Sequence, residues 1–188
     1  HLVIMHDETV DRTTNGHGYV RDLTFDEIRG LDAGKGERVP TLDEVLNLTQ
    51  GVVKLQVELK VPEALKPSLE VIERRGAEDD VLIISFMHVL LKEAKRLKPN
   101  IETGALFSKV PEDICERAID VGAGSILVYY RSLNSEVVKK AHKLGLTVAA
   151  WNPNTIEDMK YTINLGVDII GSDRPDILIN LLKSMGLR

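Results

Sequence analysis

The stretch Leu55-Gln56-Val57-Glu58-Leu59-Lys60 has the alternating pattern of a short β-strand with one apolar and one polar face. Its leucines and valine share one side, and Gln56, Glu58 and Lys60 share the other. An active-site strand of a closed parallel barrel has this pattern, with apolar side chains facing outer helices and polar side chains facing the interior. An edge strand with one solvated face has it too, so this stretch alone leaves both interpretations open.

Downstream of this stretch, short apolar runs alternate with amphipathic segments, which predicts parallel strands joined by right-handed helical crossovers. Prolines stand near the expected helix starts and glycines near the expected helix ends, where these residues cost least. With the first stretch included, the expected strands are 55–59, 81–85, 103–107, 126–130, 147–152 and 168–172. The expected helices are 63–75, 87–97, 111–121, 135–144, 155–165 and 175–185.

The residues upstream of this stretch open on an apolar run, Leu2-Val3-Ile4-Met5, which we expect to form a further strand that ends at His6. A polar, glycine-containing segment over residues 8–18 follows, and it is typical of a long loop. Two Thr-x-x-Glu capping boxes, at 24–27 and 41–44, then predict two helix starts.

The predicted order of elements indicates an α/β fold, a (β/α)8 TIM-type barrel seen without its first strand or strands. Seven strands are expected, and such barrels are typically ~250 residues long, whereas this chain has 188. An open doubly wound sheet is the competing interpretation, less favoured because no glycine-rich phosphate-binding turn links a strand to a helix. We therefore expect a single domain over residues 1–188, incomplete at its N-terminal end.

The composition of the chain is that of a globular protein with an acidic balance. Its formal net charge is −5 and its basic residues are interleaved with acidic ones, so we expect no nucleic-acid partner. No apolar run approaches the ~20 residues of a membrane span. The lone Cys115 excludes an intramolecular disulfide. The start of the chain does not resemble a signal peptide, and the expected location is the cytoplasm.

Three side chains stand where catalytic groups of a barrel are found. His6 ends an apolar run, where an imidazole can act as general acid or base, although a lone histidine is more often structural. Glu58 and Lys60 share one side of their strand, with Cβ atoms ~7 Å apart. The carboxylate can bind a divalent cation and the ammonium a phosphate oxygen, while a plain ion pair is the alternative.

Two further residues lie on the last expected strands. Trp151 is the only tryptophan, and it either forms an apolar wall at the barrel mouth or packs beneath a helix. Asp173 precedes the final helix, and we interpret it as an N-cap-type residue rather than a ligand.

Taken together, seven short motifs in the same order resemble the glycerophosphodiester phosphodiesterase family. They cover nearly the whole chain, and they are residues 2–7, 11–16, 39–46, 57–60, 84–86, 150–152 and 166–175.

The resemblance implies a TIM-type barrel that hydrolyses glycerophosphodiesters to sn-glycerol 3-phosphate and an alcohol, with Mg²⁺ or Ca²⁺ as cofactor. It implies that His6 is the catalytic histidine that protonates the leaving oxygen and that Glu58 is a metal ligand. It also implies that Lys60 lies near the phosphate and Trp151 near the glycerol. A small-molecule substrate, without a nucleic acid or stable membrane insertion, is the implied partner.

The chain departs from the family pattern at its start. The family begins with a strand bearing His-Arg-Gly and another bearing Glu-x-Asp, and neither motif is in this sequence. We therefore expect the isolated chain to be inactive or nearly so. One alternative is a shortened, non-catalytic homologue that self-associates through open strand edges, which would make it a homo-oligomer. Another is a phosphodiesterase of the same fold that acts on lysophospholipids.

Overall fold

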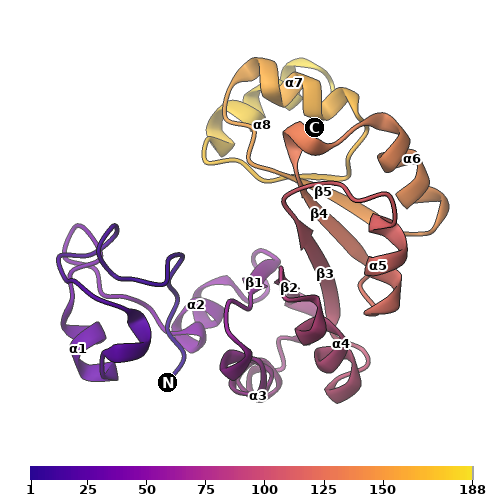
Figure 1. The fold of residues 1–188 in the computed structure, drawn as a ribbon. Coiled ribbons are helices and arrows are strands. Elements are labelled where there is room, and N and C mark those ends of the chain that lie inside the picture. The colour runs from indigo at the N-terminus through magenta and orange to yellow at the C-terminus, as the bar shows by residue number, and fades with distance from the viewer. Residues whose placement is uncertain (188) are drawn as a thin grey trace. The chain divides into compact units, whose positions relative to one another are not determined.

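The computed structural model describes residues 1–187, which form two compact units (Figure 1). The first unit comprises His1–Leu55 and Val61–Val81, and the second comprises Gln56–Lys60 and Leu82–Arg188. The second unit contains nearly all of the sheet, whereas the first consists of helices and loops with the end residues of two strands.

The sheet contains six strands whose spatial order follows the chain, β1-β2-β3-β4-β5-β6. The pairs from β2 to β6 are parallel. An order without reversal is that of a barrel-type sheet, because a doubly wound sheet reverses its strand order at a switch point. The predicted fold class is therefore confirmed. The strands are β1 Leu55–Glu58, β2 Val81–Ser85, β3 Glu102–Phe107, β4 Ser125–Tyr129, β5 Thr147–Trp151 and β6 Ile169–Ile170.

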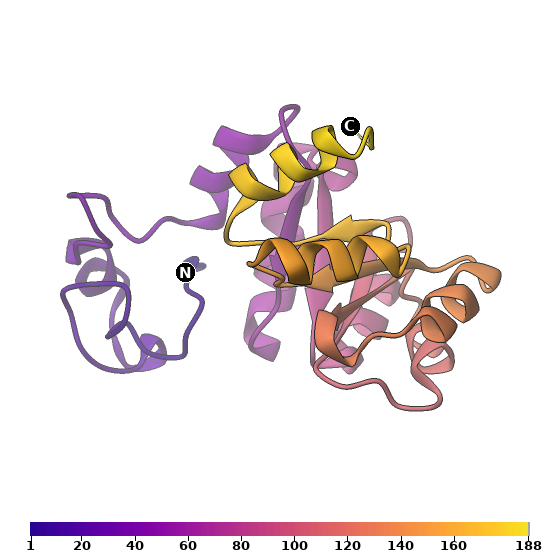
Figure 2. The ribbon, with the colours of Figure 1, turned by 90° about the horizontal axis from the view of Figure 1, so that it is seen from above.

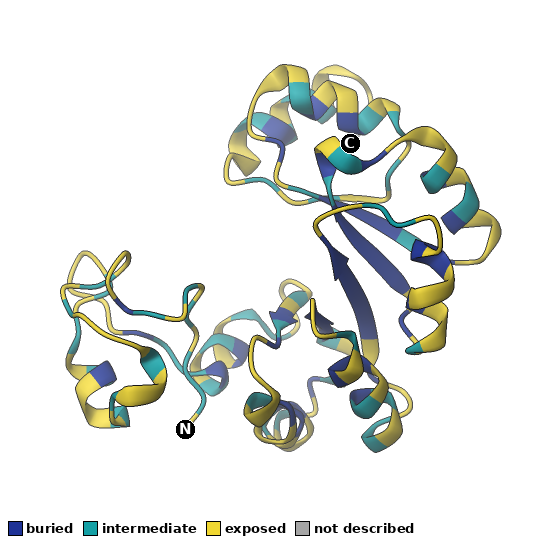
Figure 3. Cartoon of the chain, viewed as in Figure 1, coloured by how far each residue is buried: buried dark blue, intermediate teal, exposed yellow. Residues whose placement is uncertain are grey.

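A helix follows each strand from β2 onward, as the alternating pattern predicts. Asn134 and Thr155 cap two of these helices, because each side chain accepts hydrogen bonds from backbone N–H groups of the first turn. In Figure 3 the strands are mostly buried, and the helices expose one face. The last two helices contact each other (Figure 1, Figure 2). The helices are α4 His88–Leu97, α5 Ile114–Asp120, α6 Ser135–Lys143, α7 Ile156–Asn164 and α8 Pro175–Ser184.

One face of the sheet carries an apolar cluster that supports the strand ends. Because side chains alternate along a strand, every second residue of β2 to β5 points to this face. Gly104 lies on the same face, and a Cβ atom there would lie 2.5 Å from Leu127 Cδ1, so a larger residue would require the Leu127 side chain to shift. The cluster consists of Leu82, Ile84, Leu106, Leu127 and Ala149, with Trp151 packed against it.

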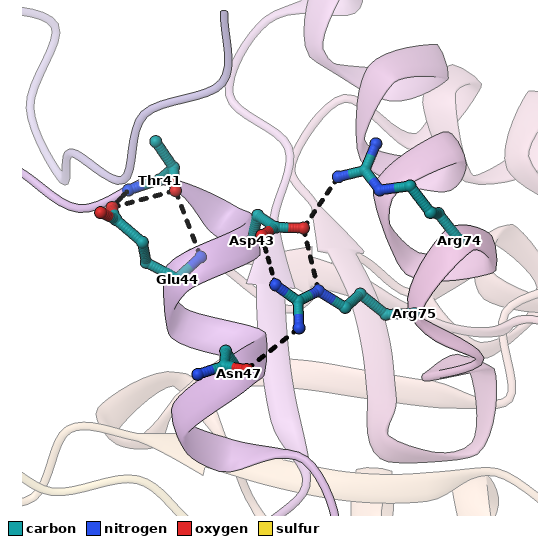
Figure 4. Close-up of polar contacts among 6 residues, drawn as sticks. All are labelled: Thr41, Asp43, Glu44, Asn47, Arg74 and Arg75. Atoms are coloured by element: carbon teal, nitrogen blue, oxygen red, sulfur yellow. Dashed lines mark hydrogen bonds and ion pairs between the residues drawn. The ribbon is translucent and has the colours of Figure 1, made fainter.

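In the first unit, capping boxes start α1 and α2, and ion pairs join α2 to α3. Both predicted boxes form, with each threonine accepting from the backbone N–H of the glutamate three residues later. Asp43 of α2 binds Arg74 and Arg75 of α3, and Arg75 also donates to Asn47 (Figure 4). The α-helices of this unit are α1 Phe25–Gly30, α2 Leu42–Thr49 and α3 Leu65–Arg75.

The prediction of a strand over residues 2–5 is wrong. This run forms no strand ladder with the described residues, and Ile4 N donates instead to Pro40 O at 2.8 Å. Alternating or apolar sequence makes a strand only where another strand pairs with it, and the described residues give this run none. The last expected strand, 168–172, is reduced to the two residues of β6.

None of the helices within residues 1–187 combines the length and the apolar character that a membrane span needs.

Candidate active site

Glu58 and Lys60 form an ion pair at the carboxyl end of β1. Lys60 Nζ lies 2.9 Å from Glu58 Oε1, and their side chains are 35% and 24% exposed, respectively. Val57 and Leu59 are buried on the opposite side of the strand, as the alternation predicts. The structure therefore brings these two predicted site residues together. Because both side chains are partly exposed, the ammonium group of Lys60 remains accessible to an anionic ligand.

Ser85 fixes the end of the strand that carries Glu58. Its hydroxyl donates to Leu59 O at 2.7 Å and accepts from Met87 N at 3.0 Å, and the side chain is fully buried. Leu59 N donates to Ile84 O at 2.8 Å. The buried hydroxyl thus both donates and accepts within the protein, so Ser85 holds β1 against β2.

Trp151 ends β5 and packs on the apolar cluster of the sheet. Its ring centroid lies 5.4 Å from that of Tyr129, and Phe86 meets it edge-to-face at 6.1 Å. Phe86 is half-exposed, so this aromatic group offers apolar surface at the carboxyl ends of β2, β4 and β5. The indole Nε1 is buried and has no hydrogen-bond partner in the described part of the chain. Whether Trp151 contacts a substrate stays a prediction.

Asp173 does not cap α8, so the N-cap interpretation is wrong. The N-cap position belongs to Arg174, because Pro175 is the first helical residue, and no side chain of the described residues caps this helix. Asp173 instead accepts from Asn154 Nδ2 at 2.6 Å and from Asn152 Nδ2 at 3.3 Å. Its carboxylate therefore joins the loop after β6 to the loop after β5.

His6 lies in the first unit, within a chain of charged groups. Its Nδ1 is 2.7 Å from Asp7 Oδ1, and Arg12 donates to the same carboxylate through Nε at 2.6 Å and Nη2 at 2.9 Å. The hydrogen bonds from Arg12, and then that from His6, hold the pKa of Asp7 well below its usual range. The His6 side chain is 76% exposed with Nδ1 directed to Asp7, and its catalytic role stays a prediction.

The sequence interpretation missed the partners of both His6 and Asp173. Asp7 and Arg12 are five positions apart in a loop, a spacing with no regular structural meaning. Asn154 and Asp173 are separated by a whole helix. The only signal was the crowding of polar residues directly after two strands, at 152–154 and 172–173.

A divalent cation such as Mg²⁺ or Ca²⁺ needs several oxygen ligands close together. The carboxylate of Glu58 is instead paired with the ammonium group of Lys60. Within residues 1–187, no three His, Cys, Asp or Glu side chains lie close enough together to hold a metal ion. The described residues therefore do not make up a complete cation site.

The sheet order and the charged and aromatic groups at its strand ends define the class, a TIM-type barrel enzyme. Comparison with known proteins narrows the class. The sequence pattern of the glycerophosphoryl diester phosphodiesterase family matches residues 1–177. A glycerophosphodiester phosphodiesterase of Caldanaerobacter subterraneus subsp. tengcongensis is 38% identical and aligns with 99% of this chain and 82% of its own length. A glycerophosphodiester phosphodiesterase of Bacillus subtilis is 31% identical and aligns with 97% of this chain and 72% of its own length.

Solved structures agree with these sequence relatives. An Oleispira antarctica phosphodiesterase in complex with the product sn-glycerol-3-phosphate superimposes with a TM-score of 0.89 at 27% identity, covering 96% of this chain and 79% of that one. A glycerophosphodiester phosphodiesterase from Parabacteroides distasonis superimposes with a TM-score of 0.83 at 25% identity, covering 98% of this chain and 79% of that one. The chain belongs to the glycerophosphoryl diester phosphodiesterase family, as its motifs predicted.

Proposed function

We propose that this protein hydrolyses glycerophosphodiesters to sn-glycerol 3-phosphate and an alcohol. The observation that carries the proposal is the likeness to the Oleispira antarctica phosphodiesterase, whose structure holds the product sn-glycerol-3-phosphate. In this reaction the oxygen of water forms a new P–O bond and gives up a proton, the P–O bond to the alcohol breaks, and the alcohol oxygen takes up a proton. The cytoplasmic location, self-association and the lysophospholipid alternative stay predictions.

For Lys60 we propose contact with a non-bridging phosphate oxygen. Its ammonium group is held at a strand end by Glu58, and it carries three N–H donors of which one faces that carboxylate. A preorganised cation beside a phosphoryl group stabilises the negative charge that develops in the transition state. The apolar face of Trp151 supplies a surface for the carbon atoms of the glycerol moiety.

For His6 we propose the role of general acid toward the leaving alcohol oxygen. Asp7 lies against Nδ1, so the proton that is transferred is assigned to the other ring nitrogen, Nε2. Arg12 holds the carboxylate through two hydrogen bonds, which fixes the orientation of the ring through Asp7.

Dependence on Mg²⁺ or Ca²⁺ is part of the same proposal, with Glu58 as one of the ligands. A single carboxylate binds such a cation weakly, and the described residues supply no cluster that would complete its coordination. We therefore assign no step of the reaction to the cation.

The experiment that tests the function measures release of glycerol 3-phosphate from glycerophosphocholine, with and without EDTA. It uses the 188-residue chain and, beside it, the chain extended upstream in its reading frame. We expect EDTA-sensitive release, stronger in the extended protein. Absence of release from both proteins would overturn the function, and release that EDTA leaves unchanged would overturn the cation dependence alone.

A further inference from the structure

The loops that follow β5 and β6 are joined by a reciprocal set of hydrogen bonds. Asn154 Nδ2 donates to Asp173 Oδ2, while Asn154 Oδ1 accepts from Asp173 N at 2.9 Å and from Ser172 Oγ at 3.0 Å. The same carboxylate accepts from Asn152 through its other oxygen, Oδ1. Both carboxylate oxygens are thus used, and each binds the loop that starts directly after Trp151.

The backbone near Trp151 is held by the same loop. Gly171 N donates to Ala150 O at 2.8 Å, which brings the residue after β6 alongside the last residues of β5. A Cβ atom at Gly171 would come within 3.7 Å of Asn152 Oδ1 and 3.9 Å of Trp151 Cβ. The indole is therefore linked through one residue, Asn152, to a carboxylate on the neighbouring loop.

We propose that Asp173 is a positioning residue, which sets the orientation of Trp151 by fixing the loop after β5. It acts through Asn152 and Asn154 and touches no reacting atom. The part of the inference that concerns substrate rests on the proposed function, in which the indole contacts the glycerol moiety. The positioning itself is a property of the free protein and is measurable without any reaction.

The chemistry of the pair explains why aspartate is required at position 173. A carboxylate has two acceptor oxygens and satisfies both asparagine amides, whereas a carboxamide has one acceptor oxygen and presents an N–H₂ group to one of them. Asp173→Asn therefore loses one of the two bonds and places two donors face to face. These bonds are exposed to water, so their loss loosens the loop without unfolding the protein.

Exchanging the side chains of Asp173 and Asn154 should restore the hydrogen bonds that Asp173→Asn loses. In the double variant Asp173→Asn with Asn154→Asp, the new carboxylate at 154 accepts from Ser172 Oγ, from the backbone N–H at 173 and from the new amide. The oxygen of that amide still accepts from Asn152. Every hydrogen bond of the set is thus kept, with the direction of one reversed.

Fluorescence reports on Trp151 directly, because it is the only tryptophan of the 188-residue chain. We would measure acrylamide quenching of Trp151 and its titration with sn-glycerol 3-phosphate, with the thermal midpoint as a check on folding. For Asp173→Asn we expect easier quenching and about threefold weaker product binding, as for loss of one exposed hydrogen bond. The exchange variant should return both values toward the wild type. Asp176→Asn is the matched control, because Asp176 lies three residues away and binds only Arg174 among the described side chains.

Each outcome of these measurements supports or overturns the positioning role of Asp173. Wild-type quenching in Asp173→Asn, or no recovery in a folded exchange variant, would overturn the positioning role. If Asp173→Asn does not fold, Asn154→Ala removes the same bond from the other side and is judged by the same quenching. If neither the 188-residue chain nor its extended form binds sn-glycerol 3-phosphate, the proposed function fails, while the quenching series still decides whether Asp173 positions Trp151.

Discussion

Lys60 Nζ lies 2.9 Å from Glu58 Oε1, so the two charged residues that the resemblance assigns to different ligands neutralise each other in the free protein. The pair is partly exposed, and ion pairs of this kind contribute little to stability, ~0–1 kcal/mol. A substrate phosphate that binds Lys60 competes with Glu58 for the same ammonium group. In the proposed cation role, Glu58 would be one of the ligands, and its ion pair with Lys60 would then be replaced. The ion pair between Glu58 and Lys60 therefore contributes little to stability, and its two side chains can serve the reaction instead.

Glu58→Gln tests this separation of function and stability. We expect the EDTA-sensitive activity to fall by at least ~10²-fold, the range found when a group that stabilises the transition state is removed. The thermal midpoint should change little, because only one partly exposed ion pair is lost. Glu63→Gln is the control, since Glu63 is an exposed glutamate five residues away. Undiminished turnover of Glu58→Gln at saturating Mg²⁺ would contradict the ligand role.

The acid role of His6 predicts a dependence on the leaving group. His6→Ala should lose ~10²–10⁴-fold in rate with a poor leaving group such as choline, because an alkoxide must be protonated as it departs. With an activated aryl alcohol the loss should be much smaller. The control is His17→Ala, because His17 also pairs with an aspartate, Asp11, in the same region and is 87% exposed. Equal losses with both leaving groups would exclude the acid role.

Features that depend on local sequence could be predicted, whereas contacts between segments distant in the sequence could not. β2 has the predicted bounds, Val81–Ser85, because a strand buried on both faces is an unbroken apolar run. The capping box at Thr41 is a contact between residues three positions apart, and local spacing predicts it. The link between Asn154 and Asp173 depends on which strands are neighbours, and no local pattern encodes that.

The ion pairs between α2 and α3 predict a pH-dependent stability. Hydrogen bonds from Arg75, and then from Arg74, lower the pKa of Asp43 from its ordinary value of 3.8 (Figure 4). A carboxyl group with a lowered folded-state pKa stabilises the fold above its unfolded pKa, and this contribution disappears as the pH falls through the folded-state value. The difference in thermal midpoint between wild type and Asp43→Asn should therefore be constant above about pH 5 and shrink below pH 3.8.

Asp26→Asn is the matched control for that experiment. Asp26 occupies the same position of the other capping box, between Thr24 and Glu27, and it is exposed. Any effect of a missing negative charge in the first helical turn is thus present in both variants. A difference for Asp43→Asn that stays the same down to pH 2, or equals that of Asp26→Asn, would show that the arginine pairs do not stabilise the unit.

The packing of the sheet predicts the effect of a single added methyl group. In Gly104→Ala the new Cβ would lie 2.5 Å from Leu127 Cδ1 and 3.0 Å from Ser125 Oγ, within the apolar cluster that supports Trp151. Overpacking of this kind lowers the free energy of unfolding by ~1–3 kcal/mol. Gly124→Ala is the control, since a Cβ at Gly124 meets no atom within 4 Å. Denaturant unfolding gives both values, and a Gly104→Ala protein as stable as Gly124→Ala would mean that Leu127 moves aside at no cost.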